Sequence, residues 1–211
     1  MSQYDSRYFT TDDENIRNLI VPLPLPWWSR TYEYAWCTKF LNGTGTILDA
    51  ACGICHPFKF HAALNSNEMH ACDLDIRINS DEAIKVDIAK EFGHTGLDRL
   101  RSNLINKIQA NLTDLPYKND LFDTIFCIST LEHMSEEDML AALFEFKRCI
   151  KPEGHIVLTF DVPTISPIKL FDMISKADLY PVGEVDLSKP DNAIHTDMYG
   201  GLNCFRTVLY K

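Results

Sequence analysis

Hydrophobic residues occur along this chain in short runs that alternate with stretches of helical spacing. Apolar runs of about four to eight residues bounded by turn residues are typical of buried strands. They predict strands at Thr46 to Ala50, Met69 to Asp73, Lys107 to Ala110, the run after Leu121, His155 to Phe160, Val182 to Leu187 and Asn203 to Tyr210. Helical spacing predicts helices over Trp27 to Leu41, Asp81 to Phe92, Leu97 to Ile105, and after Ser135 and Ser166. Pro152-Glu-Gly154 predicts a turn, and residues 8 to 26 are expected to be irregular. This alternation predicts a doubly wound α/β fold with a seven-stranded, mostly parallel, Rossmann-like sheet.

The stretch from Thr46 to Pro57 combines a strand, a turn of small residues and the start of a helix. The small side chains of Ala51, Cys52 and Gly53 let a ligand approach the backbone closely, and Pro57 suits a first helical position. These are the usual parts of a nucleotide site in an open α/β sheet, where the ligand lies beyond the carboxyl end of the strand.

A second apolar run ends in Asp73, about 20 residues further on, a spacing at which a carboxylate can accept hydrogen bonds from ribose hydroxyls. Between Asp73 and Asn111 the chain is longer than one crossover helix requires. We therefore expect an insertion, at about residues 78–106, on the rim of the site.

The ordered motifs LDAACG, ACD, NLTDLPY, LFDTIFCISTLEHM and IKPEG, between residues 44 and 161, resemble class I S-adenosylmethionine-dependent methyltransferases of the broad small-molecule type. The resemblance implies one domain over residues 1–211. Residues 1–43 would form an N-terminal cap with a helical lid, 44–161 the cofactor-binding core, and 162–211 the rest of the sheet, with an antiparallel last strand, and the acceptor side.

The resemblance also implies the cofactor site. Asp73 would hold the ribose, the backbone at Ala51 to Gly53 the methionine part, and Asn111 the adenine, with a helix cap and a turn residue as the structural alternatives for Asp73 and Asn111. The family usually has glycine at Ala51 and Cys55 and aspartate at Asn111. The expected cofactor-binding residues are Arg30, Asp49, Ala51, Cys52, Gly53, Asp73, Leu74, Asn111, Leu112 and Ser129, with no metal.

Methyl transfer from a sulfonium needs alignment and exclusion of water, and a general base only when the acceptor must lose a proton. His133, just beyond the fourth strand, is the candidate base, because imidazole titrates near neutral pH. A role in shaping the strand end is the alternative. Asp161 and His195 are reserve candidates, and Arg30, Tyr32 or Tyr34 on the first helix could contact the cofactor or the acceptor.

The predicted function is methylation of a small metabolite, a sugar or a peptide-derived natural product. Two alternatives stay open. The departures at Ala51 and Cys55 would suit a non-catalytic partner protein that keeps the fold, and Cys52-Gly-Ile-Cys55 at a helix start would suit a thiol–disulfide oxidoreductase. A zinc site is disfavoured because no second Cys or His pair has matching spacing.

Charge and composition bear on the partners and the location of the protein. The net charge of −10 and the pI near 5.1 weigh against nucleic acid as a partner, because phosphate binding depends on Lys and Arg. No apolar run approaches the roughly 20 residues that span a bilayer, and the polar N-terminus lacks the apolar core of a secretory signal. Seven cysteines scattered through predicted elements are expected to be reduced thiols. We therefore expect a cytoplasmic protein without a membrane partner.

Overall fold

The computed structural model describes residues 2–93, 97, 100 and 102–211. The strands found there form one sheet in the order β1-β9-β6-β5-β2-β3-β4, and β7 and β8 also pair with β9. They are β1 (Arg7–Tyr8), β2 (Thr46–Ala50), β3 (Glu68–Asp73), β4 (Ile105–Gln109), β5 (Phe122–Ile128), β6 (Ile150–Val162), β7 (Tyr180–Pro181), β8 (His195–Thr196) and β9 (Leu202–Tyr210). Strands β2 to β6 run parallel, and β9 is antiparallel to β6, as predicted.

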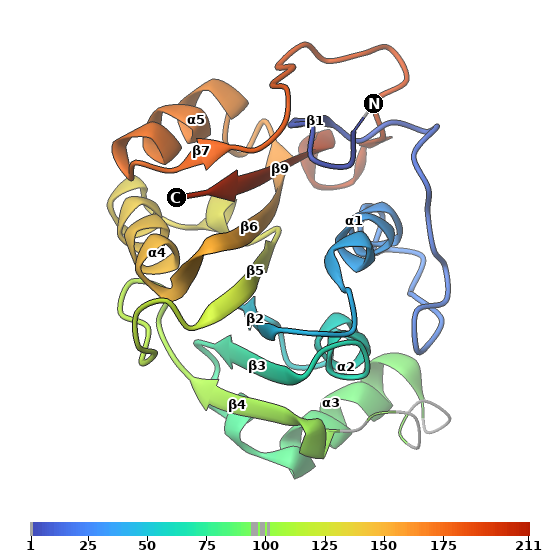
Figure 1. Cartoon of the computed structure of the whole chain (residues 1–211). Helices are drawn as coiled ribbons and strands as arrows, with labels where there is room; N and C mark the ends of the chain where they lie inside the picture. Colours follow the sequence, from blue (N-terminus) through green and yellow to red (C-terminus); the bar gives the residue numbers. More distant parts are fainter. Residues whose placement is uncertain (1, 94–96, 98–99, 101) are drawn as a thin grey trace.

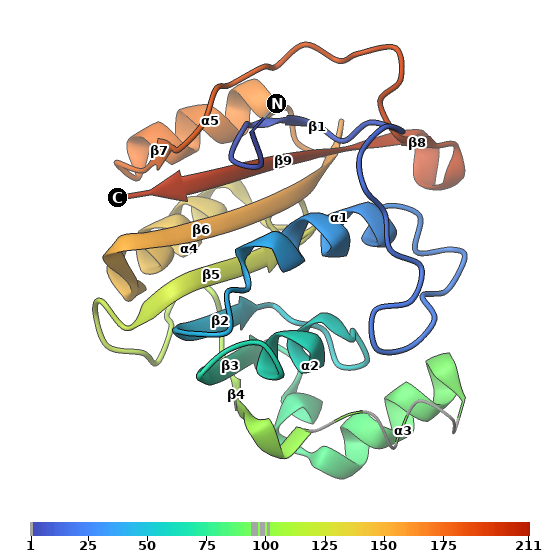
Figure 2. The ribbon, with the colours of Figure 1, turned by 45° about the vertical axis from the view of Figure 1, so that its right-hand side comes forward.

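Helices cover both faces of this sheet (Figures 1 and 2). The α-helices of the described chain are α1 (Arg30–Cys37), α2 (Phe58–Ala63), α3 (Asp81–Phe92), α4 (Glu136–Cys149) and α5 (Pro167–Lys176). The 3-10 helices are η1 (Thr38–Phe40), η2 (Ile76–Asn79), η4 (Ser102–Leu104), η5 (Leu131–His133) and η6 (Met198–Gly200). One apolar core lies between the sheet and α4 and α5, and a second lies between the sheet and α1, α2 and α3.

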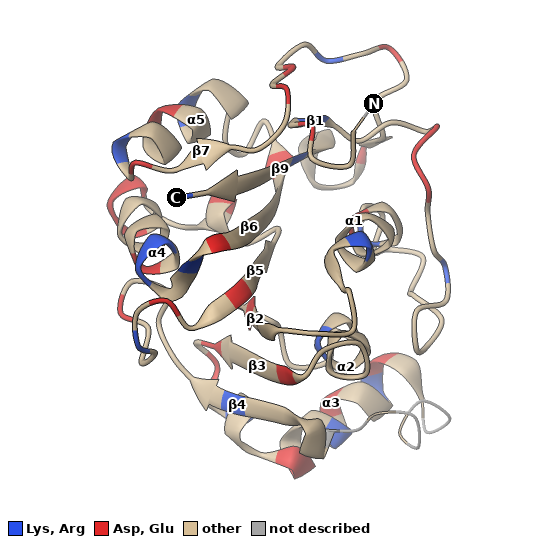
Figure 3. Cartoon of the chain, in the orientation of Figure 1, with Lys and Arg blue, Asp and Glu red and all other residues tan. Residues whose placement is uncertain are grey.

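Local sequence explains where the helices begin. Ser135 caps α4, because its Oγ accepts a hydrogen bond from the backbone N–H of Asp138 (3.1 Å). Ser166 caps α5 in the same way, and Pro167 occupies the first turn, where a missing N–H is tolerated. In Figure 3 charged positions are spread over α3, α4 and α5, Lys and Arg among Asp and Glu, while apolar positions of the same helices pack on the sheet.

Two local predictions are wrong. The turn expected at Pro152 to Gly154 lies inside β6, where pairing with β5 shifts from Phe122 opposite Ile150 to Thr124 opposite His155, so the extra residues form an irregularity within one strand. The strand expected at Val182 to Leu187 is also absent.

The edge of the sheet explains the missing strand. The N-terminal strand β1, whose Tyr8 begins the segment expected to be irregular, pairs with β9. Ser6 exchanges hydrogen bonds with the segment that was expected to form a strand, donating to Glu184 (2.7 Å) and accepting from Asp186 (2.9 Å). Gly183 approaches so closely that an added Cβ would lie 2.5 Å from the carbonyl oxygen of Tyr4. The N-terminal segment therefore separates residues 184–186 from β9.

The helices of residues 27–105 follow the predictions closely. The predicted helix over Trp27 to Leu41 is α1 followed by η1, and the predicted helix at Asp81 to Phe92 is α3. The helix predicted at Leu97 to Ile105 lies partly outside the described residues, and its described end contains η4. In the part of the chain that the structure covers, none of the helices has the length and apolar character needed to cross a bilayer.

Candidate active site

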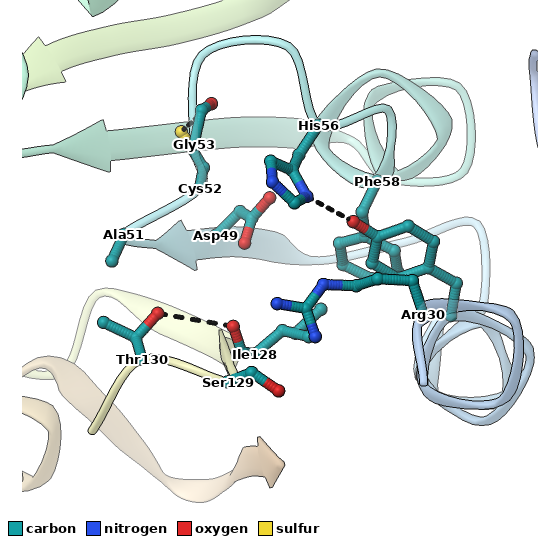
Figure 4. Close-up of a pocket in the computed structure, with 11 residues that line it drawn as sticks. Arg30, Asp49, Ala51, Cys52, Gly53, His56, Phe58, Ile128, Ser129 and Thr130 are labelled. Atoms are coloured by element: carbon teal, nitrogen blue, oxygen red, sulfur yellow. Dashed lines mark hydrogen bonds between the residues drawn. The ribbon is translucent and has the colours of Figure 1, made fainter. Parts of the chain in front are cut away.

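Three neighbouring cavities open at the carboxyl ends of β2, β3, β5 and β6. The inner cavity, of about 150 Å³, lies between the turn after β2 and the end of β5, and Arg30 of α1 reaches into it (Figure 4). The edge cavity, of about 310 Å³, lies at the ends of β3 and β4 and shares Ala51 and Thr130 with the inner cavity. The aromatic cavity, of about 470 Å³, shares Arg30 and His56 with the inner cavity.

The turn after β2 has a left-handed backbone. Ala51 has φ +55° and Gly53 has φ +61°, a conformation that favours glycine. An added Cβ on Gly53 would lie 2.5 Å from Cδ2 of His56. Alanine at position 51, where the family usually has glycine, therefore still permits the turn, whereas Gly53 is required by both its angles and its neighbour.

A buried lysine holds this turn from beneath. Lys59 of α2 is fully buried, and its Nζ donates hydrogen bonds to the carbonyl oxygens of Gly53 (2.6 Å), His56 (2.8 Å) and Cys52 (3.3 Å). An ammonium group has three donors, and here each has an acceptor. The turn thus depends on a side chain that enters from the following helix.

An ion pair anchors Arg30 at the mouth of the inner cavity. Arg30 pairs with Glu33, whose carboxylate also accepts hydrogen bonds from Ser29 (2.8 Å), Ser129 (2.6 Å) and Thr159. Burial alone would raise the pKa of Glu33, but the charge of Arg30 and the hydroxyl hydrogen bonds outweigh burial and lower it. One buried carboxylate therefore joins α1 and its N-cap residue to the end of β5 and to β6.

Asp49 and His56 face the same cavity (Figure 4). Burial raises the pKa of Asp49 to about 7, and Asp73 adds to this effect, while Lys59 opposes it. His56 is held by the hydroxyl of Tyr34, 2.7 Å from its Nδ1, and by stacking on Trp27 with ring centroids 4.3 Å apart. Burial lowers the pKa of His56 well below its usual value, so the ring is neutral at physiological pH.

The edge cavity contains the residues expected to hold the nucleoside. Asp73 accepts hydrogen bonds from the backbone N–H groups of Gly53 (2.8 Å) and Asp75 (3.0 Å), so it also fixes the turn after β2. Asn111 accepts from the N–H of Thr113 (3.1 Å), as a turn residue does. Leu74 and Leu112 supply apolar surface to the same cavity.

These cavities fit S-adenosylmethionine. The inner cavity offers a guanidinium and a carboxyl group for the zwitterionic end of the methionine, and the edge cavity offers a carboxylate for the ribose and apolar surface for the adenine. Shared lining at Ala51 and Thr130 makes the two spaces continuous. The ten residues expected from the sequence to bind the cofactor all line one or both of these cavities.

The aromatic cavity lies on the other side of Arg30 and His56. It is lined by Trp27 and Trp28, by His133 of η5 and by Asp161 of β6, with Tyr199 of η6 as a further aromatic wall. His133 therefore lies in this cavity, as does the reserve candidate Asp161. His195 is absent from the lining of all three cavities and lies beside Asp197 (3.0 Å).

Sequence reasoning missed Glu33, His56 and Lys59. Glu33 follows Arg30 by three residues and precedes Trp36 by three, so it falls on a predicted apolar helix face, where a carboxylate needs a partner. Lys59 belongs to a helix of only six residues, and His56 lies in the turn just before it, so neither residue falls in a stretch long enough for a reliable pattern.

The two cysteines of the turn are unsuited to redox chemistry. Both thiols are free, and burial raises the pKa of Cys52 well above its usual value and that of Cys55 to a smaller extent. A reactive thiol needs the opposite shift. This observation opposes the oxidoreductase alternative.

Fold and site together define a class I S-adenosylmethionine-dependent methyltransferase. A family model described as a methyltransferase domain matches residues 48–158, more than half of the chain. The chain belongs to this methyltransferase domain family, whose cofactor is S-adenosylmethionine.

Among curated proteins, the chain is similar to the ubiquinone/menaquinone biosynthesis C-methyltransferase UbiE of Vibrio campbellii, with 33% identity over 115 residues. That match covers 52% of this chain and 44% of the relative, so less than half of the relative's length is involved.

Solved structures agree on the fold. The TehB-like S-adenosylmethionine-dependent methyltransferase of Corynebacterium glutamicum has a TM-score of 0.57 at 16% identity, over 85% of this chain and 86% of its own. The cyclase SpnF has a TM-score of 0.56 at 19% identity, over 82% and 62%. A cyclase with this fold shows that the fold alone does not specify the acceptor.

Proposed function

We propose that this enzyme transfers the methyl group of S-adenosylmethionine to a small molecule held in the aromatic cavity. The observation that carries the proposal is that the aromatic and inner cavities share Arg30 and His56. An acceptor in one cavity can therefore approach a cofactor in the other while protein surrounds both, which favours alignment and excludes water.

The charges of the residues in the inner and edge cavities indicate which part of the cofactor each residue would bind. Arg30, kept cationic beside Glu33, suits the methionine carboxylate, and Asp49 suits the ammonium group. Asp73 keeps a free lone pair on each oxygen beyond its two backbone contacts, and these suit ribose hydroxyls. Ser129 acts through Glu33, because its hydroxyl donates to that carboxylate.

The cofactor supplies a methyl group bonded to a cationic sulfur, so the protein needs no covalent intermediate of its own. His133 is exposed at the edge of the aromatic cavity, where it can take a proton from an acceptor hydroxyl or amine. Residues 1–43 would act as the cap of this cavity, because Trp27 and Trp28 form its wall.

The acceptor is proposed to be a small metabolite, a sugar or a peptide-derived natural product. The UbiE relative is named for C-methylation in quinone biosynthesis, but this name is a weak guide here. The family match ends at residue 158, and most of the aromatic cavity, including Trp27, Trp28, Asp161 and Tyr199, lies outside it.

Product trapping tests this proposal. Purified protein would be incubated with a small-molecule metabolite extract and S-adenosylmethionine carrying a deuterated methyl group, and labelled products would be identified by mass spectrometry. We expect a labelled small molecule, and we expect His133→Asn to lower its rate of formation by about 100-fold while cofactor affinity stays within about threefold. Label found only in protein would contradict the proposal of a small-molecule acceptor. Unchanged turnover in His133→Asn would contradict the role of His133 as the base.

Cofactor binding should depend on pH through Asp49. Its pKa of about 7, above the ordinary value, means that the carboxylate that attracts the methionine ammonium forms only as pH rises through neutrality. We expect affinity for S-adenosylhomocysteine to rise by up to about tenfold between about pH 6 and 8, measured by titration calorimetry. Asp49→Asn should bind more weakly and with little pH dependence; a variant that keeps the wild-type pH profile would assign the titration to another group.

A further inference from the structure

Aromatic side chains from two distant parts of the chain line the aromatic cavity. Trp27 and Trp28 precede α1, and Tyr199 lies in η6, just before β9. Trp27 is fixed by stacking on His56 and by an edge contact with Phe92, whose ring centroid lies 5.5 Å away. Tyr199 has a left-handed backbone (φ +60°) and is 71% exposed, so its ring stands at the mouth of the cavity. Aromatic faces attract cations, tryptophan most strongly.

Asp161 supplies the carboxylate of this cavity. Its backbone N–H donates to Oε1 of Glu132 (2.9 Å), which fixes the residue at the end of β6. Its Oδ1 is buried and has no hydrogen-bond partner among the described residues. A buried carboxylate oxygen without a donor is destabilising, so such an atom calls for a donor from outside the chain.

The charge around Asp161 favours a cation as that donor. Burial raises the pKa of Asp161 to about 6 and that of its neighbour Glu132 to about 8, so at neutral pH Asp161 carries the negative charge. Arg30 also lines the cavity and stays cationic, but the carboxylate of Glu33 balances its charge, so the ion pair adds no net charge. His56 is neutral. The cavity wall therefore has a net negative charge beside aromatic faces.

We propose that the acceptor is a small amine that binds in its ammonium form, with the nitrogen donating a hydrogen bond to Asp161 and lying against the rings of Trp27, Trp28 and Tyr199. Because an ammonium nitrogen has no lone pair, methylation at that nitrogen requires prior transfer of its proton to a base such as His133. This inference rests on the proposed function, in that the aromatic cavity is taken to hold the acceptor. Asp161 is then a specificity-determining residue. A neutral alcohol of the same shape could reach Asp161 but would gain neither the charge attraction nor the cation–π contact.

A matched pair of probes tests the proposal. Phenethylammonium and 2-phenylethanol would be titrated by ligand-observed NMR into protein saturated with S-adenosylhomocysteine. We expect the wild type to bind the ammonium at least about tenfold more tightly, as charge-assisted hydrogen bonds imply. Asp161→Asn should reduce this preference to within about threefold, and Tyr199→Leu should weaken binding of the ammonium more than that of the alcohol.

Asp197→Asn is the control, because Asp197 is a fully exposed carboxylate that lies near Tyr199 in the chain and does not line the cavity. It should keep the wild-type preference. Unchanged affinity of Asp161→Asn for S-adenosylhomocysteine would show that the variant is folded. Equal binding of both probes by the wild type, or a preference that survives Asp161→Asn, would overturn the proposal.

The product-trapping experiment separates this inference from the proposed function. A labelled neutral acceptor, together with no preference for the ammonium, would refute the amine class and leave small-molecule methylation standing. A clear ammonium preference without any labelled small molecule would support the amine site and refute the proposed function.

Discussion

Replacing Glu33 by alanine is expected to lower the free energy of unfolding by about 3 to 5 kcal/mol, because removing one partner of a buried ion pair leaves the other charge uncompensated. Glu33 is fully buried and is the acceptor for Arg30, Ser29, Ser129 and Thr159. The variant would leave a guanidinium and three hydroxyl groups without that acceptor. Urea denaturation followed by circular dichroism would measure the loss.

Glu14→Ala is the matched control. Glu14 pairs with Lys39 at 3.1 Å, but its side chain is 69% exposed, and surface pairs of this kind contribute about 0 to 1 kcal/mol. Similar losses for Glu33→Ala and Glu14→Ala would show that the buried network contributes little to stability. We also expect Glu33→Ala to weaken cofactor binding, because Arg30 would no longer be held at the inner cavity.

Replacing Lys59 by methionine should destabilise the protein about as much as Glu33→Ala. Methionine keeps an apolar chain of similar length, but it leaves the carbonyl oxygens of Cys52, Gly53 and His56 without their shared donor. At about 1 to 3 kcal/mol for each unsatisfied buried group, we expect a loss of about 3 to 5 kcal/mol in the free energy of unfolding. Affinity for S-adenosylhomocysteine should fall by at least about tenfold, because the turn after β2 would lose the hydrogen bonds that hold its backbone in place.

The same variant has a second readout. Lys59 lowers the pKa of Asp49 against the larger effect of burial, so its removal should raise that pKa further. The midpoint of the pH dependence of cofactor binding should then move above neutrality in Lys59→Met. Lys176→Met, at an exposed position on α5 that pairs with Asp172, should change neither quantity appreciably. A stable Lys59→Met protein with an unshifted pH midpoint would contradict this account of the turn.

Much of the sheet and the cofactor side of the site could be predicted because their signals are local. The strand at Thr46 to Ala50 was predicted with its observed bounds, and the helix at Asp81 to Phe92 likewise. Asp73, Ala51 and Gly53 could be identified because a strand end and its turn lie within a few residues of each other. Parallel strands then place their carboxyl ends along one edge of the sheet.

The wrong predictions concern segments whose strand partners lie far along the chain. A strand was predicted at Val182 to Leu187, but Arg7–Tyr8 pairs with β9 instead, and a two-residue strand has no detectable period. A turn was predicted at Pro152 to Gly154 because turn residues indicate local bends. In the structure, pairing with β5 at Ile150 and again from His155 keeps β6 continuous on both sides of them.

Periodicity and turn chemistry act over a few residues, so they were enough to predict the alternation of strands and helices, the small-residue turn and the carboxylate that follows it. Which side chains share a charge or a cavity follows from the packing of distant elements. Glu33 accepts hydrogen bonds from Ser129 and Thr159, which lie 96 and 126 residues further along the chain. Trp27 and Asp161 line one cavity although they lie far apart in the sequence. Such contacts depend on how whole elements pack, and a burial that costs a charged group several kcal/mol is compensated only when those distant partners arrive.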